Sequence, residues 1–311
     1  MNEHESKILI LGGTGNYGTF ITNNLINANV NCRLFTRNPE KAKRVFGNKI
    51  EIAIGNIEDI KSLRNAYQGI DRLICAISAF SVSQIRRYTQ IETDAVISAL
   101  RLAEEMGIRR LVYISVFEIN KDFMNQQRLP LGHEKAKVED YISKSNINWT
   151  ILGCPPSMEI FFRMIHGNNM MVPGGGPKGL PSVSPYDVGE IIKQAILRDD
   201  LSGQRFQLVA PRTYSFPEAA SIISEIWKKP IKFRKIPITF PKIAYHITGF
   251  FSPFSDRLLY IHNLLSFIRL LNNFPEDYID KVPMIHKKLL SIFSYLPSSL
   301  EIEANRRNPG F

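Results

Sequence analysis

The sequence is poor in cysteine and tryptophan, with three cysteines and two tryptophans among 311 residues. The cysteines lie far apart and form no Cys-x-x-Cys pair, which argues against a disulfide framework and against a metal site built on cysteine. Long apolar runs are also lacking, because the uncharged stretch 8–32 is interrupted by four glycines and six asparagines. It is therefore not a membrane span. The first seven residues include two glutamates, which is not typical of a secretory signal, so we expect a reducing, cytoplasmic setting.

Acidic residues are the minority among the charged ones, with 29 Asp and Glu against 39 Lys and Arg and a net charge of +10. Such an excess can attract phosphates or acidic surfaces. No aromatic-basic nucleic-acid motif accompanies it, so we expect a basic, solvated surface and no nucleic-acid partner. Internal repeats and low-complexity tracts are absent from the sequence. Hydrophobic residues make up 44% of the chain, which is enough for one large core with a smaller lobe.

What the sequence does contain is an apolar strand that runs straight into glycines, KILILGGTGNYG at 7–18. The stretch matches both Gly-x-Gly-x-x-Gly and Gly-x-x-Gly-x-x-Gly. Glycines at these places allow a tight turn, a close approach of the backbone to a pyrophosphate, and close packing of the next helix. The phosphates then lie at a helix N-terminus, where unpaired N–H groups stabilise anionic oxygens. The alternative is a plain structural turn. The expected contacts are Gly12, Gly13, Thr14, Gly15, Asn16, Tyr17 and Gly18.

Apolar strand patterns alternate with amphipathic helix patterns as far as residue 152, which predicts an α/β fold with a doubly wound parallel sheet of the Rossmann type. The predicted strands are 7–12, 30–36, 50–54, 72–77, 110–116 and 148–153. The predicted helices are 18–28, 39–46, 58–68, 83–106 and 133–145. The second helix begins with Asn38 as its cap, Pro39 in the first helical position and Glu40 in the first turn.

The end of the second strand indicates which dinucleotide is preferred. NAD sites place an acidic residue there to bind the ribose 2′-hydroxyl, whereas this sequence has Thr36 and Arg37. Arg37 suits a 2′-phosphate, so NADP(H) is expected, with NAD(H) as the alternative. Arg33 and Lys41 either add positive charge at this site or are ordinary surface residues.

Three further strand ends supply candidate contacts, since ligands of open parallel sheets bind outside the carboxyl ends of the strands. Asn56 and Ile57 follow the third strand, where a turn closes over the adenine in many such folds. Ser115 ends the fifth strand and either faces the nicotinamide and substrate or caps the next turn. The fourth strand is followed by Ala76, Ile77 and Ser78.

The segments GGTGNYG, TRNPEKA, LVYISV and HEKAKVEDYISKSNINWTILGCP resemble the NmrA-like group of atypical short-chain dehydrogenase/reductases, with its quinone and isoflavone reductase relatives. The resemblance covers roughly residues 7–156 and continues more weakly to about 235. It implies an NAD(P)H-binding fold and an active site that contains Ser115 and Lys135, with Glu139 beside them. Lys135 and Pro155, which follows the sixth strand, are added to the expected cofactor contacts.

The sequence departs from the pattern of ordinary dehydrogenases at three places. Leu131 occupies the position of the tyrosine that precedes the active-site lysine by four residues, and Asn56 replaces the usual aspartate. Cys154 takes the place of an arginine that often precedes the proline after the sixth strand. His133 would point to a different face of the helix than Lys135 and is a poor substitute for the tyrosine. These departures leave the cofactor fold secure and leave hydride transfer open.

Beyond residue 156 we expect a smaller, mixed α/β and mostly helical lobe, so the predicted domains are 1–156 and 157–311. Within the lobe, 170–185 is rich in glycine and proline and is predicted to be a loop at the substrate mouth or lobe boundary. A helix is predicted from Asp187. The lobe is further predicted to contain a strand at 204–209, a helix at 216–228 and a strand at 231–236.

The segment 240–296 is more apolar than the rest of the lobe. A helix is predicted at 256–274, with an apolar face wider than half its circumference, and a shorter one at 287–295. The apolar face packs in the core, or forms a partner surface, an apolar substrate pocket or a membrane-surface contact. Its polar stripe carries only one arginine, Arg269, which favours burial against protein over lipid.

Together these features predict an NADP(H)-binding protein that reduces a quinone or small carbonyl substrate. The alternative is a catalytically inactive, cofactor-sensing regulator or assembly factor of the same group, because the usual tyrosine is missing. Partners would be a small-molecule substrate or another protein, with a homodimer as one option. No metal site is expected.

Overall fold

The computed structural model describes residues 7–79, 87–118, 122, 130–237 and 265–309. Among them, seven parallel strands form one sheet in the order β3-β2-β1-β4-β5-β6-β9. The strands are β1 (Ile8–Leu11), β2 (Cys32–Thr36), β3 (Glu51–Ile54), β4 (Arg72–Cys75), β5 (Arg110–Val116), β6 (Asn148–Cys154) and β9 (Gln204–Gln207). The first six confirm the predicted strands and the Rossmann-type sheet. β1 to β4 are shorter than predicted, β5 has the predicted length, and β6 is one residue longer.

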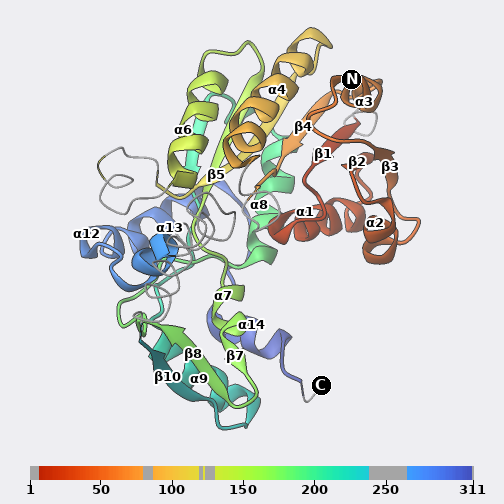
Figure 1. Cartoon of the computed structure of the whole chain (residues 1–311). Coiled ribbons are helices and arrows are strands. Elements are labelled where there is room, and N and C mark those ends of the chain that lie inside the picture. The colour runs from red at the N-terminus through yellow and green to blue at the C-terminus, as the bar shows by residue number, and fades with distance from the viewer. Residues whose placement is uncertain (1–6, 80–86, 119–121, 123–129, 238–264, 310–311) are drawn as a thin grey trace, which may run out of the picture.

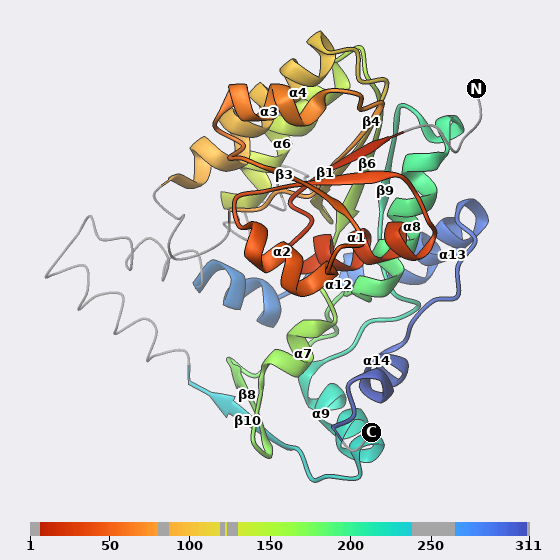
Figure 2. The same ribbon diagram turned by 90° about the vertical axis from the view of Figure 1, so that its right-hand side faces the viewer.

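Helices cover both faces of this sheet (Figure 2). One face carries α1 (Asn16–Asn27), α2 (Pro39–Phe46) and α8 (Pro185–Leu197), and the other carries α3 (Ile60–Tyr67), α4 (Val96–Glu105) and α6 (Pro130–Ser143). Strand β1 serves both layers, because Ile8 and Ile10 join the core under α1 while Leu9 and Leu11 join the core under α3 and α4. All four side chains are fully buried, as expected for a central parallel strand with helices on both sides.

The predicted helix 83–106 is described from residue 87 onward, and its first part differs from a regular helix. A π-helical turn, η2 (Gln90–Ala95), precedes α4. Single π-turns inside helices are uncommon and frequently occur at functional sites. Helix α6 starts at residue 130, three residues earlier than predicted, and the side chain of Leu131 lies outside the described part of the structure.

The prediction that strand 204–209 belongs to the small lobe is wrong. Strand β9 pairs in parallel with β6 and extends the large sheet, and α8 packs closely against α1. The short 3₁₀ turn η3 (Asp199–Leu201) connects α8 to β9. The large sheet and the helices packed on it therefore include residues beyond 156, as far as the end of β9 at residue 207.

The smaller lobe lies below the large sheet in the view of Figure 1. It has a sheet of order β10-β8-β7, from β7 (Ile165–His166), β8 (Asn169–Pro173) and β10 (Lys232–Ile236). Helices α7 (Glu159–Arg163), α9 (Phe216–Trp227) and α14 (Leu300–Arg306) accompany it. The helix and strand predicted at 216–228 and 231–236 are confirmed, whereas β8 lies where the sequence predicted part of a loop.

The C-terminal segments return to the large sheet and to the junction between the two sheets. Helix α12 (Glu276–Ile279) is followed by α13 (Val282–Ile292), and Phe293 packs edge-on against Phe206 of β9 with 5.4 Å between ring centroids. The predicted helix 256–274 is described only from residue 265, and 265–272 is helical. In this part Ile268, Leu271 and Phe274 are buried, so the apolar face packs on protein as expected. Residues 256–264 lie outside the described ranges.

Within the described ranges, none of the helices combines the length and apolar character that crossing a bilayer requires. The same ranges hold no group of three or more histidine, cysteine, aspartate or glutamate side chains placed to bind a metal ion.

Candidate functional site

A cleft of about 760 Å³ runs along the carboxyl ends of the strands of the large sheet and continues toward the smaller lobe. The structure brings most of the predicted contacts together along it. Those that line the cleft are Gly12, Thr14, Gly15, Asn16, Tyr17, Arg37, Asn56, Ile57, Ala76, Ile77, Ser78, Ser115, Lys135 and Pro155. Gly13 and Gly18 are not among the lining residues.

The glycines of the first loop have different tasks. Gly12 has a φ of +84°, and a Cβ there would lie 2.5 Å from the carbonyl oxygen of Ala76. A Cβ at Gly18 would lie 2.1 Å from the carbonyl oxygen of Gly12, so this glycine allows the loop and α1 to pack. Gly13 faces inward, where a Cβ would meet Leu34 and Thr22. These three glycines are required by the fold itself.

Gly15 is the glycine that leaves room for a ligand. It is the N-cap of α1, has no side chain to cap the helix, and a Cβ there would meet only the carbonyl oxygen of Gly12, at 3.1 Å. Helices are usually capped by Ser, Thr, Asp or Asn, whose side-chain oxygen accepts from a free backbone N–H. Here those N–H groups face the cleft uncapped, which is the arrangement that binds a phosphate.

Cationic side chains flank the end of β2. Arg37 and Lys41 both line the cleft, and the Lys41 ammonium donates to the carbonyl oxygen of Thr14 at 2.8 Å. Lys41 is placed there by α2, whose N-cap Asn38 accepts from the Lys41 N–H, as the sequence predicted for this cap. Arg33 points elsewhere: it pairs with Glu51 and donates to the carbonyl oxygens of Ala66 and Gln68. The option that Arg33 adds charge to the cofactor site is therefore wrong.

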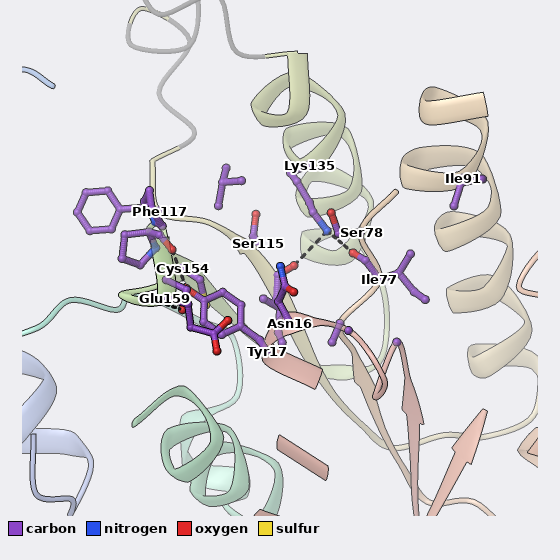
Figure 3. A pocket seen from close by; sticks show the side chains of 18 of the residues that line it. Asn16, Tyr17, Ile77, Ser78, Ile91, Ser115, Phe117, Lys135, Cys154 and Glu159 are labelled. Atoms are coloured by element: carbon purple, nitrogen blue, oxygen red, sulfur yellow. Dashed lines mark hydrogen bonds between the residues drawn. The ribbon is translucent and has the colours of Figure 1, made fainter. Parts of the chain in front are cut away.

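Lys135 lines the cleft, and Figure 3 shows its ammonium group hydrogen-bonded to two backbone carbonyl oxygens. It forms an ion pair with Glu92 at 2.7 Å and donates to the carbonyl oxygens of Ile77 at 2.9 Å and Ile114 at 3.2 Å. The side chain is 5% exposed and that of Glu92 is 0% exposed. Lys135 thus ties the ends of β4 and β5 to the helix that follows β4.

Glu92 was not found from the sequence. It is in the π-turn η2, and its second carboxylate oxygen accepts from the Ala79 N–H at 2.7 Å. Burial by itself would lower the pKa of Lys135, but the Glu92 carboxylate outweighs burial and raises the pKa above its ordinary value. Lys135 is therefore a permanent cation at neutral pH, with a buried counterion of its own. Gln90, Thr93 and Asp94 flank it, so the sequence does not distinguish Glu92 from its polar neighbours.

Ser115 has the opposite environment. Its residue is 4% exposed, it lines the cleft, and its Oγ has no hydrogen-bond partner among the described residues. A buried hydroxyl without a partner is costly, and such groups commonly mark a place where a ligand or water binds. Ser115 lies opposite Gly153 in the register of β5 and β6, so no side chain from β6 fills the space next to it.

Two side chains beside Ser115 are unreactive at neutral pH. Tyr17 donates its hydroxyl to the carbonyl oxygen of Pro155 at 2.8 Å, and burial raises its pKa well above the ordinary value. Cys154 is buried, which raises the pKa of its thiol to about 12. Neither group is an efficient acid or nucleophile in this state.

Glu139, which the resemblance placed beside Lys135, lies outside the cleft lining. It pairs with Arg205 of β9 at 2.8 Å, and Arg205 also donates to the carbonyl oxygen of Val116 at 2.8 Å. A Cβ at Gly153 would lie 2.7 Å from that oxygen and 3.0 Å from the guanidinium group. The predicted active-site role of Glu139 is thus replaced by a structural one, in which it helps Arg205 to fix the end of β5. His133 is half-buried and does not line the cleft.

Past Ser115 the cleft opens into a chamber with mostly apolar walls. Phe117 follows β5, and Ile160 and Met164 come from α7 and the residue after it. The segment 265–274 closes the far side. It contributes Ser266, Phe267, Leu270 and Phe274. Of the alternatives for the predicted helix 256–274, its described part thus serves both as core and as wall of an apolar pocket. Besides Ser266, polar side chains at the chamber are those of Glu118, Glu159 and Arg163.

Comparison with known proteins agrees with this geometry. A model of the NAD(P)H-binding family matches residues 12–199. Among curated proteins, photosystem II assembly factor Ycf39 of Guillardia theta is 22% identical over 269 residues, 82% of each chain. An NAD(P)H azoreductase of Xenophilus azovorans is 21% identical over 249 residues, 79% of this chain and 82% of the relative.

Solved structures with a similar fold match nearly the full length of the chain. The NADPH complex of the quinone oxidoreductase QOR2 of Escherichia coli superposes with a TM-score of 0.70 at 18% identity and covers 96% of this chain and 99% of that one. The triphenylmethane reductase of Citrobacter sp. gives a TM-score of 0.71, also at 18% identity, and covers 98% and 100%. At this level of identity the match concerns the fold alone.

Proposed function

The chain belongs to the NAD(P)H-binding family, with the fold of the NmrA-like atypical short-chain dehydrogenase/reductases, and from this premise we propose that it is an NADPH-dependent reductase of quinones or similar conjugated carbonyl compounds. The observation that carries the proposal is the unpaired hydroxyl of Ser115. It is aimed into the cleft where the glycine-rich half meets the apolar chamber.

The residues of the first half of the cleft fit NADPH. The uncapped N-terminus of α1 receives the pyrophosphate, and the space that Gly15 leaves open allows the phosphate to approach the backbone. Arg37 and Lys41 are the cations nearest the end of β2 and would bind the 2′-phosphate, because no acidic side chain from β2 competes for the ribose. Ala76, Ile77 and Ser78 line the cleft between these residues and Ser115, where the second ribose would lie.

Bound NADPH supplies a hydride to an electron-deficient acceptor. Ser115 donates a hydrogen bond to the acceptor oxygen and so orients the acceptor and stabilises the charge that develops on this oxygen. The apolar walls that Phe117 and 265–274 provide exclude water from the chamber and fit a flat, conjugated ring. Lys135 acts indirectly: as a cation held by Glu92, it fixes the carbonyl groups of Ile77 and Ile114 that border the site.

The shortage of proton donors favours quinones over ketones. A ketone oxygen needs a proton as it becomes an alkoxide, and general acids contribute about 10² to 10⁴-fold to such steps. The Lys135 and Tyr17 protons already have acceptors in the protein. A quinone accepts the hydride with less help, because the negative charge of the product spreads over the ring and its second oxygen. The second hydrogen of the hydroquinone then comes from water as a proton.

NADPH oxidation by purified protein against a panel of quinones, azo compounds and simple ketones tests the proposal. We expect turnover of quinones and little turnover of ketones. Ser115→Ala should lower kcat/KM for quinones at least tenfold and leave the Kd of NADPH within threefold. Ser143→Ala is the matched control, since the Ser143 hydroxyl is exposed and donates to Asp140 in its own helix. Tight NADPH binding without turnover of any quinone would refute the reductase function.

A cofactor-sensing protein or assembly factor is the second candidate, and its support is the similarity to photosystem II assembly factor Ycf39 over 82% of the chain. In this case NADPH binding would change a protein contact and no substrate would be reduced. The same NADPH oxidation assay separates the two candidates, because only the reductase consumes NADPH.

We further propose two domains that differ from the sequence division in one respect. The cofactor domain consists of 1–156 together with α8 and β9, and the remaining residues form the substrate lobe. The cytoplasmic location and the homodimeric state of the protein stay predictions. Light scattering of the purified chain measures its oligomeric state.

A further inference from the structure

We propose that Asn272 is a positioning residue for the substrate: it fixes the apolar wall 265–274 at a set distance from Ser115 without touching the ligand itself. The inference rests on the proposed function, because the wall bounds the chamber where the substrate would bind. Asn272 is not among the residues that line the cleft, whereas Phe267, Leu270 and Phe274 on the same segment are.

The orientation of the wall 265–274 must be fixed, because one set of its side chains lines the chamber and another set packs away from it. Phe267, Leu270 and Phe274 line the chamber, while Ile268 and Leu271 are buried in the core. Apolar packing is not directional, so by itself it does not fix the rotation or height of a short helix. Hydrogen bonds do so, and the side chain of Asn272 makes them to another part of the fold.

Asn272 uses both ends of its amide. Its Nδ2 donates to the carbonyl oxygens of Pro173 at 3.0 Å and Ile268 at 2.7 Å, and its Oδ1 accepts from the Gly176 N–H at 2.8 Å. The first of these bonds reaches the last residue of β8, and the third reaches the loop that follows it. We call Asn272 together with residues 173–176 the Asn272 clamp.

The loop is shaped to receive this amide. Gly174, Gly175 and Gly176 all have positive φ, at +77°, +94° and +51°, which glycine adopts without strain. A Cβ at Gly174 would lie 2.5 Å from the Asn272 amide atoms, so the backbone wraps directly around this side chain. The clamp therefore gives a reason for the glycine-rich composition of this loop.

The loop itself is fixed on its other side. The Gly174 N–H donates to the carbonyl oxygen of Ile236 in β10 at 2.8 Å, and the Gly176 carbonyl accepts from the Phe216 N–H of α9 at 3.1 Å. The small sheet and α9 therefore hold one side of the clamp, and the wall is the other. The clamp thus links the smaller lobe to the wall of the chamber.

The clamp acts on the site through the last ring of the wall. Phe274 lies two residues after Asn272 and packs against Phe117, with 6.4 Å between ring centroids. Phe117 in turn follows β5, two residues after Ser115. A displacement of about 1 Å in a bound reactant can cost on the order of 100-fold in rate, so a small tilt of the wall would affect substrate fit.

A matched pair of variants tests the inference. Asn272→Ala removes the clamp, and Asn273→Ala removes an amide from the next position, which is exposed and bonds only its own helix, at Arg269. We expect Asn272→Ala to raise the KM for 1,4-naphthoquinone at least tenfold, to leave the Kd of NADPH within twofold, and to speed hydrogen exchange of the Gly176 amide at least tenfold. Asn273→Ala should leave all three within twofold.

Gly174→Ala approaches the clamp from the loop side and should give the same pattern as Asn272→Ala, because its Cβ would displace the amide. Faster Gly176 exchange in Asn272→Ala with no change in KM would overturn the positioning role and leave a structural one. Equal behaviour of Asn272→Ala and Asn273→Ala would overturn the inference altogether.

Failure of the proposed function gives a different result. If the parent protein reduces no quinone, the reductase function is refuted on its own. Binding of 1,4-naphthoquinone, measured by equilibrium dialysis with NADP⁺ present, then replaces KM as the readout. Weaker binding in Asn272→Ala than in Asn273→Ala supports the clamp, and equal or absent binding in both overturns it.

Discussion

Replacing Glu92 by glutamine should destabilise the protein by several kcal/mol, although the change only replaces one carboxylate oxygen by an amide nitrogen. Glu92 and Lys135 are 2.7 Å apart with side chains 0% and 5% exposed. At this distance and an effective dielectric constant of about 20, their attraction is roughly 6 kcal/mol. Glutamine retains an acceptor for the Ala79 N–H but leaves the Lys135 cation without a counterion. Removing one partner of a buried pair costs about 3–5 kcal/mol, which is the effect we expect.

The pH dependence of stability gives a second signature. In the parent protein the pKa of Lys135 is raised above its ordinary value, so its contribution is fully present below a pH of about 10 and is lost only as pH rises through the folded pKa. Between pH 6 and 9 this contribution is therefore constant. In Glu92→Gln, Lys135 is still buried but the carboxylate that raised its pKa is gone. The pKa of Lys135 should therefore fall below its value in the unfolded chain. The variant should then gain stability relative to the parent as pH rises from 6 to 9.

Urea unfolding of the full chain at pH 6 and pH 9 measures both effects. Asp140→Asn is the control, since Asp140 pairs with Lys144 on the surface with side chains 65% and 71% exposed, and exposed pairs contribute about 0–1 kcal/mol. Glu92→Gln combined with Lys135→Met should recover at least half of the loss, because no buried charge is then left alone. A change in unfolding free energy no larger than that of Asp140→Asn would refute the reasoning.

The double variant also decides the role of Lys135 in the reaction. If Lys135 only positions the ends of β4 and β5, quinone reduction by the double variant should remain within tenfold of the parent. A proton donor would instead be worth about 10² to 10⁴-fold. A loss of that size with unchanged NADPH affinity would return Lys135 to a direct catalytic role.

Three further predictions concern the cofactor and the cysteines. Arg37→Ala should reduce the preference for NADPH over NADH by roughly 10- to 100-fold, since one charged hydrogen bond to phosphate is worth about 1.5–3 kcal/mol. Fluorescence titration with both nucleotides measures this preference. Equal affinities in the parent would contradict the role of Arg37 at the 2′-phosphate. Gly15→Ala should weaken NADPH binding at least tenfold with little change in stability, whereas Gly18→Ala, whose Cβ meets backbone at 2.1 Å, should cost about 1–3 kcal/mol or more in urea unfolding. All three cysteines are buried, and burial raises the pKa of Cys154 to about 12, so thiol reagents should label the protein only after unfolding; fast labelling of Cys154 in the native state would show that the cleft is more open than described.

Much of the large sheet could be predicted because its signals are local. The glycines of 12–18, the cap at Asn38 and the alternation of apolar strands and amphipathic helices each depend on residues close in sequence. The carboxyl ends of the strands then follow from topology, which is why the predicted contacts gather in one cleft. Lys135 lines this cleft, and the sequence did not indicate its buried partner Glu92.

What the sequence did not predict depends on contacts between distant residues. Glu92 lies in a π-turn and pairs with Lys135, which is 43 positions later in the chain. No residue pattern predicts such a turn. Asn272 meets a loop nearly one hundred positions earlier. Strand β9 was assigned to the wrong sheet because a short edge strand carries no information about its partner.

The place of β9 also has a consequence for how the chain emerges during synthesis. Strand β6 ends at Cys154 and its outer neighbour begins at Gln204, some 50 residues later. At about 5–20 residues per second, the ribosome needs roughly 3–10 seconds to deliver that neighbour. During this interval the first six strands can pair, yet β6 still presents unpaired backbone groups along one edge. Helix α1 likewise waits for α8, against which Gly189 lets it pack closely. A nascent chain stalled between these two points would be the form most prone to aggregate or to recruit a chaperone.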